Sequence, residues 1–168
     1  MRFGKTLQPL LLLMVLGGLL NSAVVRAQAR CPWLNVATAS GVLEGPALLA
    51  MPKSTENETE CVFRFEKENT AYTLQIAVNK LSAGSKSTTL DTSDCSSPGT
   101  PLRAIGNEAL LCADDHKHSS GEEVVGRVRD THFRVVITTS AHNDSSMTRD
   151  VLEMKTRSVA EAVAGSLF

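Results

Sequence analysis

The feature that most limits how this sequence can fold is its four cysteines, which all lie after residue 30. They are Cys31, Cys61, Cys95 and Cys112. The residues before them have the pattern of a secretory signal peptide, because Arg2 and Lys5 precede an apolar, leucine-rich run over residues 7–25. Small residues follow at positions 27 and 29. Since cysteines outside the cytoplasm are usually oxidised, the sequence predicts a domain held by disulfide bonds.

Cleavage of this predicted signal peptide fits after Ala27 or after Ala29, where small residues have the required spacing. Two alternatives stay open. An uncleaved run would hold the chain in the membrane, although polar and glycine residues weaken its second half. Cys31 could carry a lipid, although Arg30 stands where a lipoprotein signal has a small residue.

We therefore expect residues 1–27 to be the signal peptide and residues 28–168 to be a single secreted or periplasmic domain of ordinary size. The whole chain has 17 Lys and Arg against 18 Asp and Glu, a net charge of −1. Residues 1–27 hold three of the cations and none of the acids, which leaves the domain at −4. No block of like charges stands out, so nucleic-acid binding is not expected.

The four cysteines allow three sets of two disulfides. We favour Cys31–Cys61, which would tie the start of the domain to its first strand, together with Cys95–Cys112, which would tie a long loop to a later strand. The spacings between successive cysteines are 30, 34 and 17 residues and match no zinc-binding pattern.

The first part of the domain predicts a short helix followed by a hairpin. Asn35 is a suitable N-cap for a helix over residues 36–43, which Gly45 and Pro46 end. Residues 47–51 are apolar without a clear period, and residues 52–60 predict a polar loop. Alternation of apolar and polar residues predicts strands over 61–65 and 72–79, joined by a turn at 67–69.

The second part predicts a loop, three more strands and a helix. Residues 82–101 are rich in Ser, Thr, Gly and Asp and predict a long loop. Strands are expected over three ranges: 108–112, 124–128 and 132–139. A polar turn at 114–121 and a tight turn at 129–131 connect them.

The end of the chain changes to helical spacing, with Val151, Met154, Val159 and Val163 on one face and Glu153 four residues before Arg157. Asp144 or Ser145 is available as its N-cap.

These elements predict an α+β fold. We expect an antiparallel sheet of about five strands, with a short N-terminal and a longer C-terminal helix packed on one face. The other face of the sheet would be solvated.

The placement of the cysteines and of short motifs resembles a family of small exported bacterial proteins of unknown function, many of them lipoproteins. The motifs are Leu43-Glu44-Gly45 after the first helix, Cys61-Val62-Phe63 in a strand, and Ile105-Gly106-Asn107-Glu108-Ala109 before another. The resemblance implies an α+β fold with helices on one face of an antiparallel sheet, and an exported location. It implies no reaction.

Two polar clusters have the residue types of a catalytic or metal site. Asp114-Asp115-His116-Lys117-His118 offers metal-binding side chains, but a solvated hairpin tip explains it better. The segment from Ser140 through His142 to Asp144 has the types of a nucleophile and base. It lacks a nucleophile elbow and is better explained as the turn before the last helix.

Several single residues can be interpreted either as structural or as functional. His132 is expected on the sheet surface, and Trp33 and Tyr72 are expected to pack in the core rather than to line a ligand groove. Asn57 and Asn143 begin glycosylation acceptor motifs, which matter only in a host that glycosylates.

The sequence therefore predicts no catalytic, cofactor-binding or metal-binding residue and no cofactor. We expect a non-enzymatic exported domain that binds a small ligand or an envelope protein through the uncovered face of its sheet or through its long loop. A small secreted hydrolase using His132 or His142, and a purely structural envelope-associated protein, are the alternatives. Contact with a membrane is expected only through an uncleaved signal peptide.

Overall fold

The computed structural model describes residues 30–81, 89–90, 94–141 and 144–168. The predicted signal peptide, residues 1–27, lies outside this part of the chain. Two helices occur in the described residues, α1 (Val36–Leu43) and α2 (Arg149–Ser166). In this part of the chain neither helix is long and apolar enough to cross a membrane.

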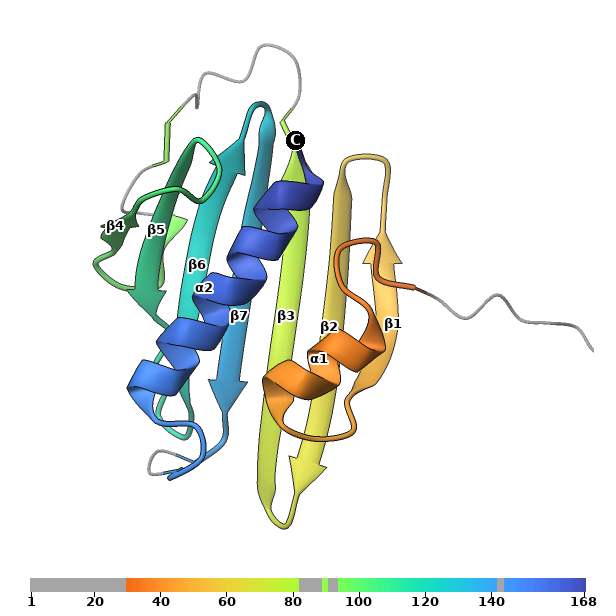
Figure 1. Ribbon diagram of the computed structural model, residues 1–168, viewed down its shortest axis with the longest axis vertical. Helices are drawn as coiled ribbons and strands as arrows, with labels where there is room; N and C mark the ends of the chain where they lie inside the picture. The colour runs from red at the N-terminus through yellow and green to blue at the C-terminus, as the bar shows by residue number, and fades with distance from the viewer. Residues whose placement is uncertain (1–29, 82–88, 91–93, 142–143) are drawn as a thin grey trace, which may run out of the picture.

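The described residues form one antiparallel sheet of seven strands, not the five or so expected. The strands are β1 (Leu48–Ser54), β2 (Glu58–Lys67), β3 (Thr70–Lys80), β4 (Thr100–Leu102), β5 (Glu108–Ala113), β6 (Ser120–Val128) and β7 (Thr131–Thr139). Their order across the sheet is β1-β2-β3-β7-β6-β5-β4. Two meanders, β1 to β3 and β4 to β7, therefore meet where β3 pairs with β7 (Figure 1). The α+β class is as predicted.

Two-residue turns fix the register of the central hairpins. Lys67 pairs with Thr70 in the β2–β3 hairpin, and Val128 pairs with Thr131 in the β6–β7 hairpin. Glu68 and Arg129 open the two turns with φ of 57° and 54°. Turns that begin with positive φ match the twist of antiparallel strands, so both hairpins have the geometry that short connections favour.

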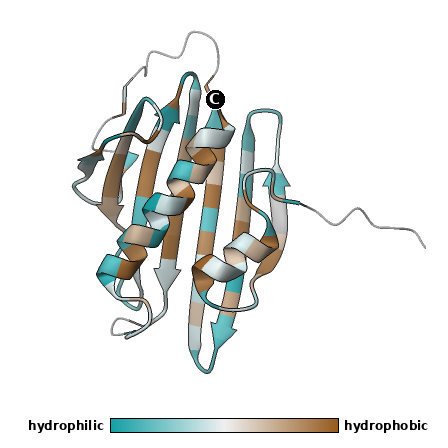
Figure 2. Ribbon diagram, viewed as in Figure 1, coloured by the Kyte–Doolittle hydropathy of each residue, from teal (hydrophilic) through white to brown (hydrophobic). Residues whose placement is uncertain are grey.

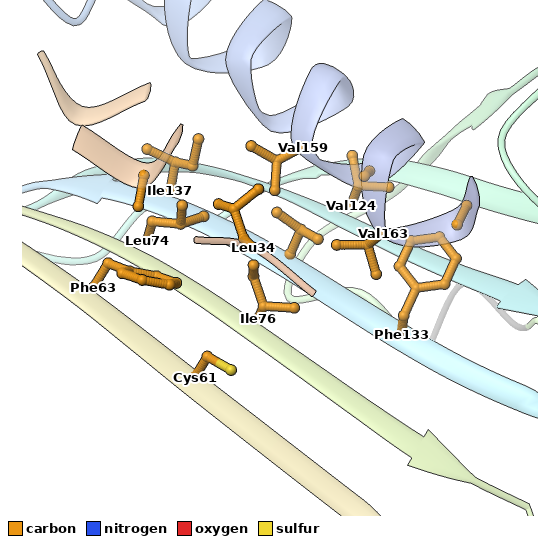
Figure 3. Close-up of a cluster of buried hydrophobic side chains, with 14 of the residues drawn as sticks. Leu34, Cys61, Phe63, Leu74, Ile76, Val124, Phe133, Ile137, Val159 and Val163 are labelled. Atoms are coloured by element: carbon orange, nitrogen blue, oxygen red, sulfur yellow. The ribbon is translucent and has the colours of Figure 1, made fainter. Parts of the chain in front are cut away.

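Both helices lie in front of the same face of the sheet in Figure 1, with α2 crossing β6 and β7 and α1 lying over β2 and β3. Alternation along the strands sends one set of apolar side chains to this face. Leu74, Ile76 and Ile137 are fully buried there, against Val159 and Val163 of α2 (Figure 3). Brown apolar segments accordingly concentrate on the central strands behind α2 in Figure 2.

The first helix begins and ends as the sequence predicts. Asn35 Oδ1 accepts a hydrogen bond from the backbone N–H of Thr38 at 2.8 Å. Glu44 takes the left-handed conformation, φ 59°, and closes the C-terminus by donating its N–H to Ser40. The Cys31–Cys61 disulfide joins the segment before this helix to β2, with the two Cα atoms 5.7 Å apart. The second disulfide joins Cys95 to Cys112, so the pairing is the one favoured from the sequence.

Several boundaries differ from the prediction, and one of them is the end of the loop expected over residues 82–101, where β4 begins at Thr100. Residues 52–60 are not a loop throughout, because β1 continues to Ser54 and β2 begins at Glu58. Residues 114–121 are not a turn throughout, because β6 begins at Ser120. The N-cap of α2 is Thr148 rather than Asp144 or Ser145. Asp144 instead accepts a hydrogen bond from the Tyr72 hydroxyl at 2.5 Å.

Candidate functional site

The sheet face opposite the helices, called the back face below, carries the polar half of each strand pattern. Cross-strand pairing aligns its side chains in rows. One row runs through Glu58, Asn79, His132, Arg127 and Glu108, each residue paired with the next across adjacent strands. The next row holds Ala77, Arg134, Val125 and Leu110 in the same way. On the back face, the row through His132 is therefore polar and the neighbouring row is partly apolar.

Part of the connection between β3 and β4 is fastened to the back face. The Cys95–Cys112 disulfide attaches it to β5, and Ser97 Oγ donates to the carbonyl of Ala113 at 2.9 Å. Further back along the chain, the N–H of Leu90 donates to Glu108 Oε2 at 2.8 Å. These ties hold described residues of the loop, and of them only the disulfide to a later strand is predicted from the sequence.

A buried charge provides another tie. The side chain of Glu123 is 0% exposed, and the Nε of Arg134 lies 2.9 Å from its Oε1. Its Oε2 accepts hydrogen bonds from the N–H of Ser96 at 3.1 Å and from the Ser96 hydroxyl at 2.9 Å. A carboxylate out of water is tolerated only when it is paired in this way. The loop therefore supplies hydrogen bonds that offset the burial of Glu123, and Glu123 in turn holds Ser96 of the loop against the sheet.

A hollow of about 410 Å³ lies between the back face and this fastened connection. Its lining residues are Glu58, Ala77, Asn79, Leu90, Asp94, Val125, Gly126, His132, Phe133 and Arg134. Its size falls within the range of small-molecule sites, which join an apolar lining to a few polar groups. The Nε2 atom of His132 is buried and has no hydrogen-bond partner among the described residues. A buried polar nitrogen without a partner is rare, and Arg127 Nε, next to His132 in the same row, shares this state among the described residues.

Charge in and beside the hollow is more negative than positive. Glu58 and Asp94 line it together with Arg134, the one cation among its described lining residues, which is paired with Glu123. Arg134 Nη2 also donates to the carbonyl of Asp94 at 2.8 Å. At the far end of the row, Glu108 accepts hydrogen bonds from Leu90 and Arg127, and these hold its pKa below the ordinary value. The positive charges near the hollow are thus largely committed to partners within the protein.

A second ionic cluster lies on the helix side of the sheet. Glu122 is 4% exposed, and its Oε1 lies 2.6 Å from Nη1 of Arg149 in the first turn of α2. Arg149 also pairs with Asp115. Burial raises the pKa of Glu122 to about 7, against the opposing effect of Arg149. This cluster joins α2 to β6, and we assign it a structural role.

The structure places the sequence-predicted candidates apart from one another. His116 and Asp114 approach to 3.4 Å at the hairpin tip between β5 and β6, where the His116 side chain is 69% exposed. The described residues contain no group of three or more His, Cys, Asp or Glu side chains arranged to hold a metal ion. Ser140 Oγ accepts a hydrogen bond from the N–H of Ala71. His142 and Asn143 lie outside the described residues.

The two large amphipathic aromatics pack as structural residues. Tyr72 is 7% exposed, and its ring stacks on Phe65 with the centroids 5.6 Å apart. The hydrogen bond to Asp144 and burial together raise the pKa of Tyr72. Burial alone would raise the pKa of Asp144, but hydrogen bonds from Tyr72 and Ser146 lower it. Trp33 packs against the core, although its buried Nε1 has no partner in the described part of the chain.

His132 is the one residue singled out in the sequence that lines the hollow, and sequence reasoning does not identify the other residues there. Glu58 falls in a range expected to be a loop, and Glu123 lies just before the strand predicted at 124–128. The usable signal is the alternation of His132, Arg134 and Val136 along β7, which points these residues away from the helices.

Comparisons of the chain with known protein families, with characterised proteins and with solved structures found no match. The two disulfides are consistent with the family resemblance seen in the sequence, and the resemblance itself stays a prediction.

Proposed function

We propose that this chain is an exported, non-enzymatic binding domain whose ligand site is the hollow between the back face and the fastened part of the β3–β4 connection. The observation that carries the proposal is the hollow of about 410 Å³, which His132 lines and whose wall is fastened by described residues of the β3–β4 connection. The two disulfides support export, because an oxidising compartment maintains such bonds.

The lining residues and the fixed wall of the site support binding more than catalysis. The hollow has an apolar floor from Ala77 and Val125 and a polar rim from neighbouring strands. The described ties from Cys95, Ser96 and Ser97 fix one wall before any ligand arrives. Such preorganisation lowers the entropy cost of binding.

Thermal-shift screening of the oxidised protein against lipids, peptides and cell-wall fragments tests the proposal, with NMR shift mapping of each hit. We expect the perturbed amides to cluster at Ala77, Val125 and His132. Ala77→Met, which fills the floor, should abolish binding. Thr73→Met, on the same face of β3 but outside the hollow, should not. Hits that map elsewhere, or no hit from a broad screen, would contradict the proposal.

A hydrolase stays the second candidate because His132 lines the hollow together with Glu58 and Asp94. A histidine and a carboxylate can together activate a water molecule. No Ser, Cys or Thr is among the described lining residues to act as a nucleophile. The same screen separates the two functions, because turnover of a bound compound that His132→Gln abolishes would establish the enzyme.

A further inference from the structure

The row of side chains at the rim of the hollow suggests what kind of group it binds. Glu58, Asn79 and His132 occupy successive positions across β2, β3 and β7. Neighbouring strands are about 4.8 Å apart, so the outer two residues of the row are about 10 Å apart at the backbone. A small polar group above Asn79 would lie about one strand spacing from the backbone of each outer residue.

The three side chains at this end of the row can accept hydrogen bonds, whereas Arg127, the next residue in the row, is a donor already paired with Glu108. Glu58 supplies a carboxylate, Asn79 supplies an amide oxygen, and a neutral imidazole supplies one nitrogen lone pair. The buried Nε2 of His132 has no partner within the described ranges of the chain. A primary ammonium group carries three N–H donors and no acceptor, which matches a row of three acceptors.

The charge balance favours the same ligand. Of the charged residues that line the hollow, Glu58 and Asp94 are acidic and Arg134 is basic, so the described lining carries one more negative than positive charge. The hollow therefore has a negative balance that attracts a cation and disfavours a carboxylate or phosphate. Beside the row, Ala77, Val125 and Leu90 form an apolar region that can receive a hydrocarbon body.

Resting on the proposed function, we infer that the ligand is a primary amine with an apolar body. Its ammonium group binds at the row of Glu58, Asn79 and His132, and its hydrocarbon part lies over Ala77 and Val125. Hydrogen bonds to a charged group are stronger than those between neutral groups, so the amine should bind about tenfold more tightly than a neutral analogue of the same shape.

The test uses three probes of equal length, hexylamine, 1-hexanol and hexanoate, titrated into the oxidised protein and followed by NMR. We expect hexylamine to bind about tenfold more tightly than either analogue. Glu58→Gln should remove most of that preference without unfolding the protein, because residue 58 is exposed. Glu161→Gln, which removes an equal charge from the exposed side of α2, should leave the preference intact.

The outcomes separate this inference from the proposed function. Equal or tighter binding of 1-hexanol or hexanoate in the hollow would overturn the inference and leave the binding function standing. An amine preference that Glu58→Gln does not change would also overturn it. If none of the three probes binds, the inference fails, and the broader ligand screen decides the proposed function by itself.

Discussion

Glu122 is a buried carboxyl group whose protonation should affect stability. Its folded-state pKa is about 7, raised by burial from an ordinary value of 4.5. A carboxyl with a raised pKa binds its proton more tightly in the folded state, so its stabilising contribution is full below about pH 4.5 and is lost as pH rises through about 7. We predict that the free energy of unfolding depends less on pH between 4.5 and 7.5 in Glu122→Gln than in the natural protein.

Urea unfolding at several pH values measures this difference, and the groups that face Glu122 define the control. They are Arg149, Asp115, Glu153 and Asp114. Glu161→Gln, away from the cluster, should keep the natural pH dependence. If Glu122→Gln shifts stability by the same amount at every pH, the carboxyl does not titrate in this range and the prediction is wrong.

Gly126 is needed because an aromatic ring occupies the place of its side chain. A Cβ at this position would overlap the Phe133 ring, which packs across from it in the β6–β7 pair. We predict that Gly126→Ala lowers the free energy of unfolding by about 1–3 kcal/mol, because the buried ring must move. Chemical denaturation measures the change.

Gly165 provides a matched control for this substitution. It lies in α2, where a Cβ would meet no atom of the described residues within 4 Å. Gly165→Ala should therefore stabilise the protein by about 0.5–1 kcal/mol through helix propensity alone. If both substitutions had the same effect, packing of Phe133 over Gly126 would not explain the glycine.

At the scale of elements, the Cys95–Cys112 disulfide fastens the wall of the hollow to β5. We predict that the double substitution Cys95→Ala with Cys112→Ala lowers stability by about 3 kcal/mol in the chain-entropy model for this loop length. The folded fraction of this variant should also bind the ligand more weakly than the natural protein does, because Ser96 would no longer be held at Glu123. Denaturation and binding measured on the same variant test both parts, and unchanged affinity would contradict the second.

Elements with regular alternation are predictable from the sequence, and those stabilised by distant contacts are not. β3 and β7 carry clear period-2 patterns, and both are predicted. β1 is not predicted, because its apolar residues lack a period and it depends on pairing with β2. The start of β6 is not predicted either, because Glu122 and Glu123 look like turn residues. Each is buried only because an arginine from α2 or β7 reaches it.

At the scale of the whole molecule, the sheet joins two meanders and uses its two faces differently. The helices cover one face, and part of the β3–β4 connection covers the other over β5, β6 and β7. The sequence indicates a sheet with one solvated face and a loop held by a disulfide. It does not indicate that the loop folds back over that face, because this depends on contacts between residues far apart in the chain, such as Ser96 with Glu123.

The two disulfides bear on the proposed location of the protein, because such bonds form and persist in an oxidising compartment. One cysteine of each pair lies in the domain interior, with Cys61 at 0% and Cys112 at 1% exposure, so oxidation must accompany folding.

We predict that protein made with residues 1–27 and recovered from the exported fraction starts after residue 27 or 29 and has a mass about 4 Da below that of its reduced form. Intact mass spectrometry with and without reductant measures both features at once. The same chain made in a reducing cytoplasm without the leader should carry four alkylatable thiols and unfold at lower denaturant concentration. Exported protein that kept both its leader and its free thiols would contradict the proposed compartment, because a hollow walled by a disulfide-tied segment would then be absent from the natural form.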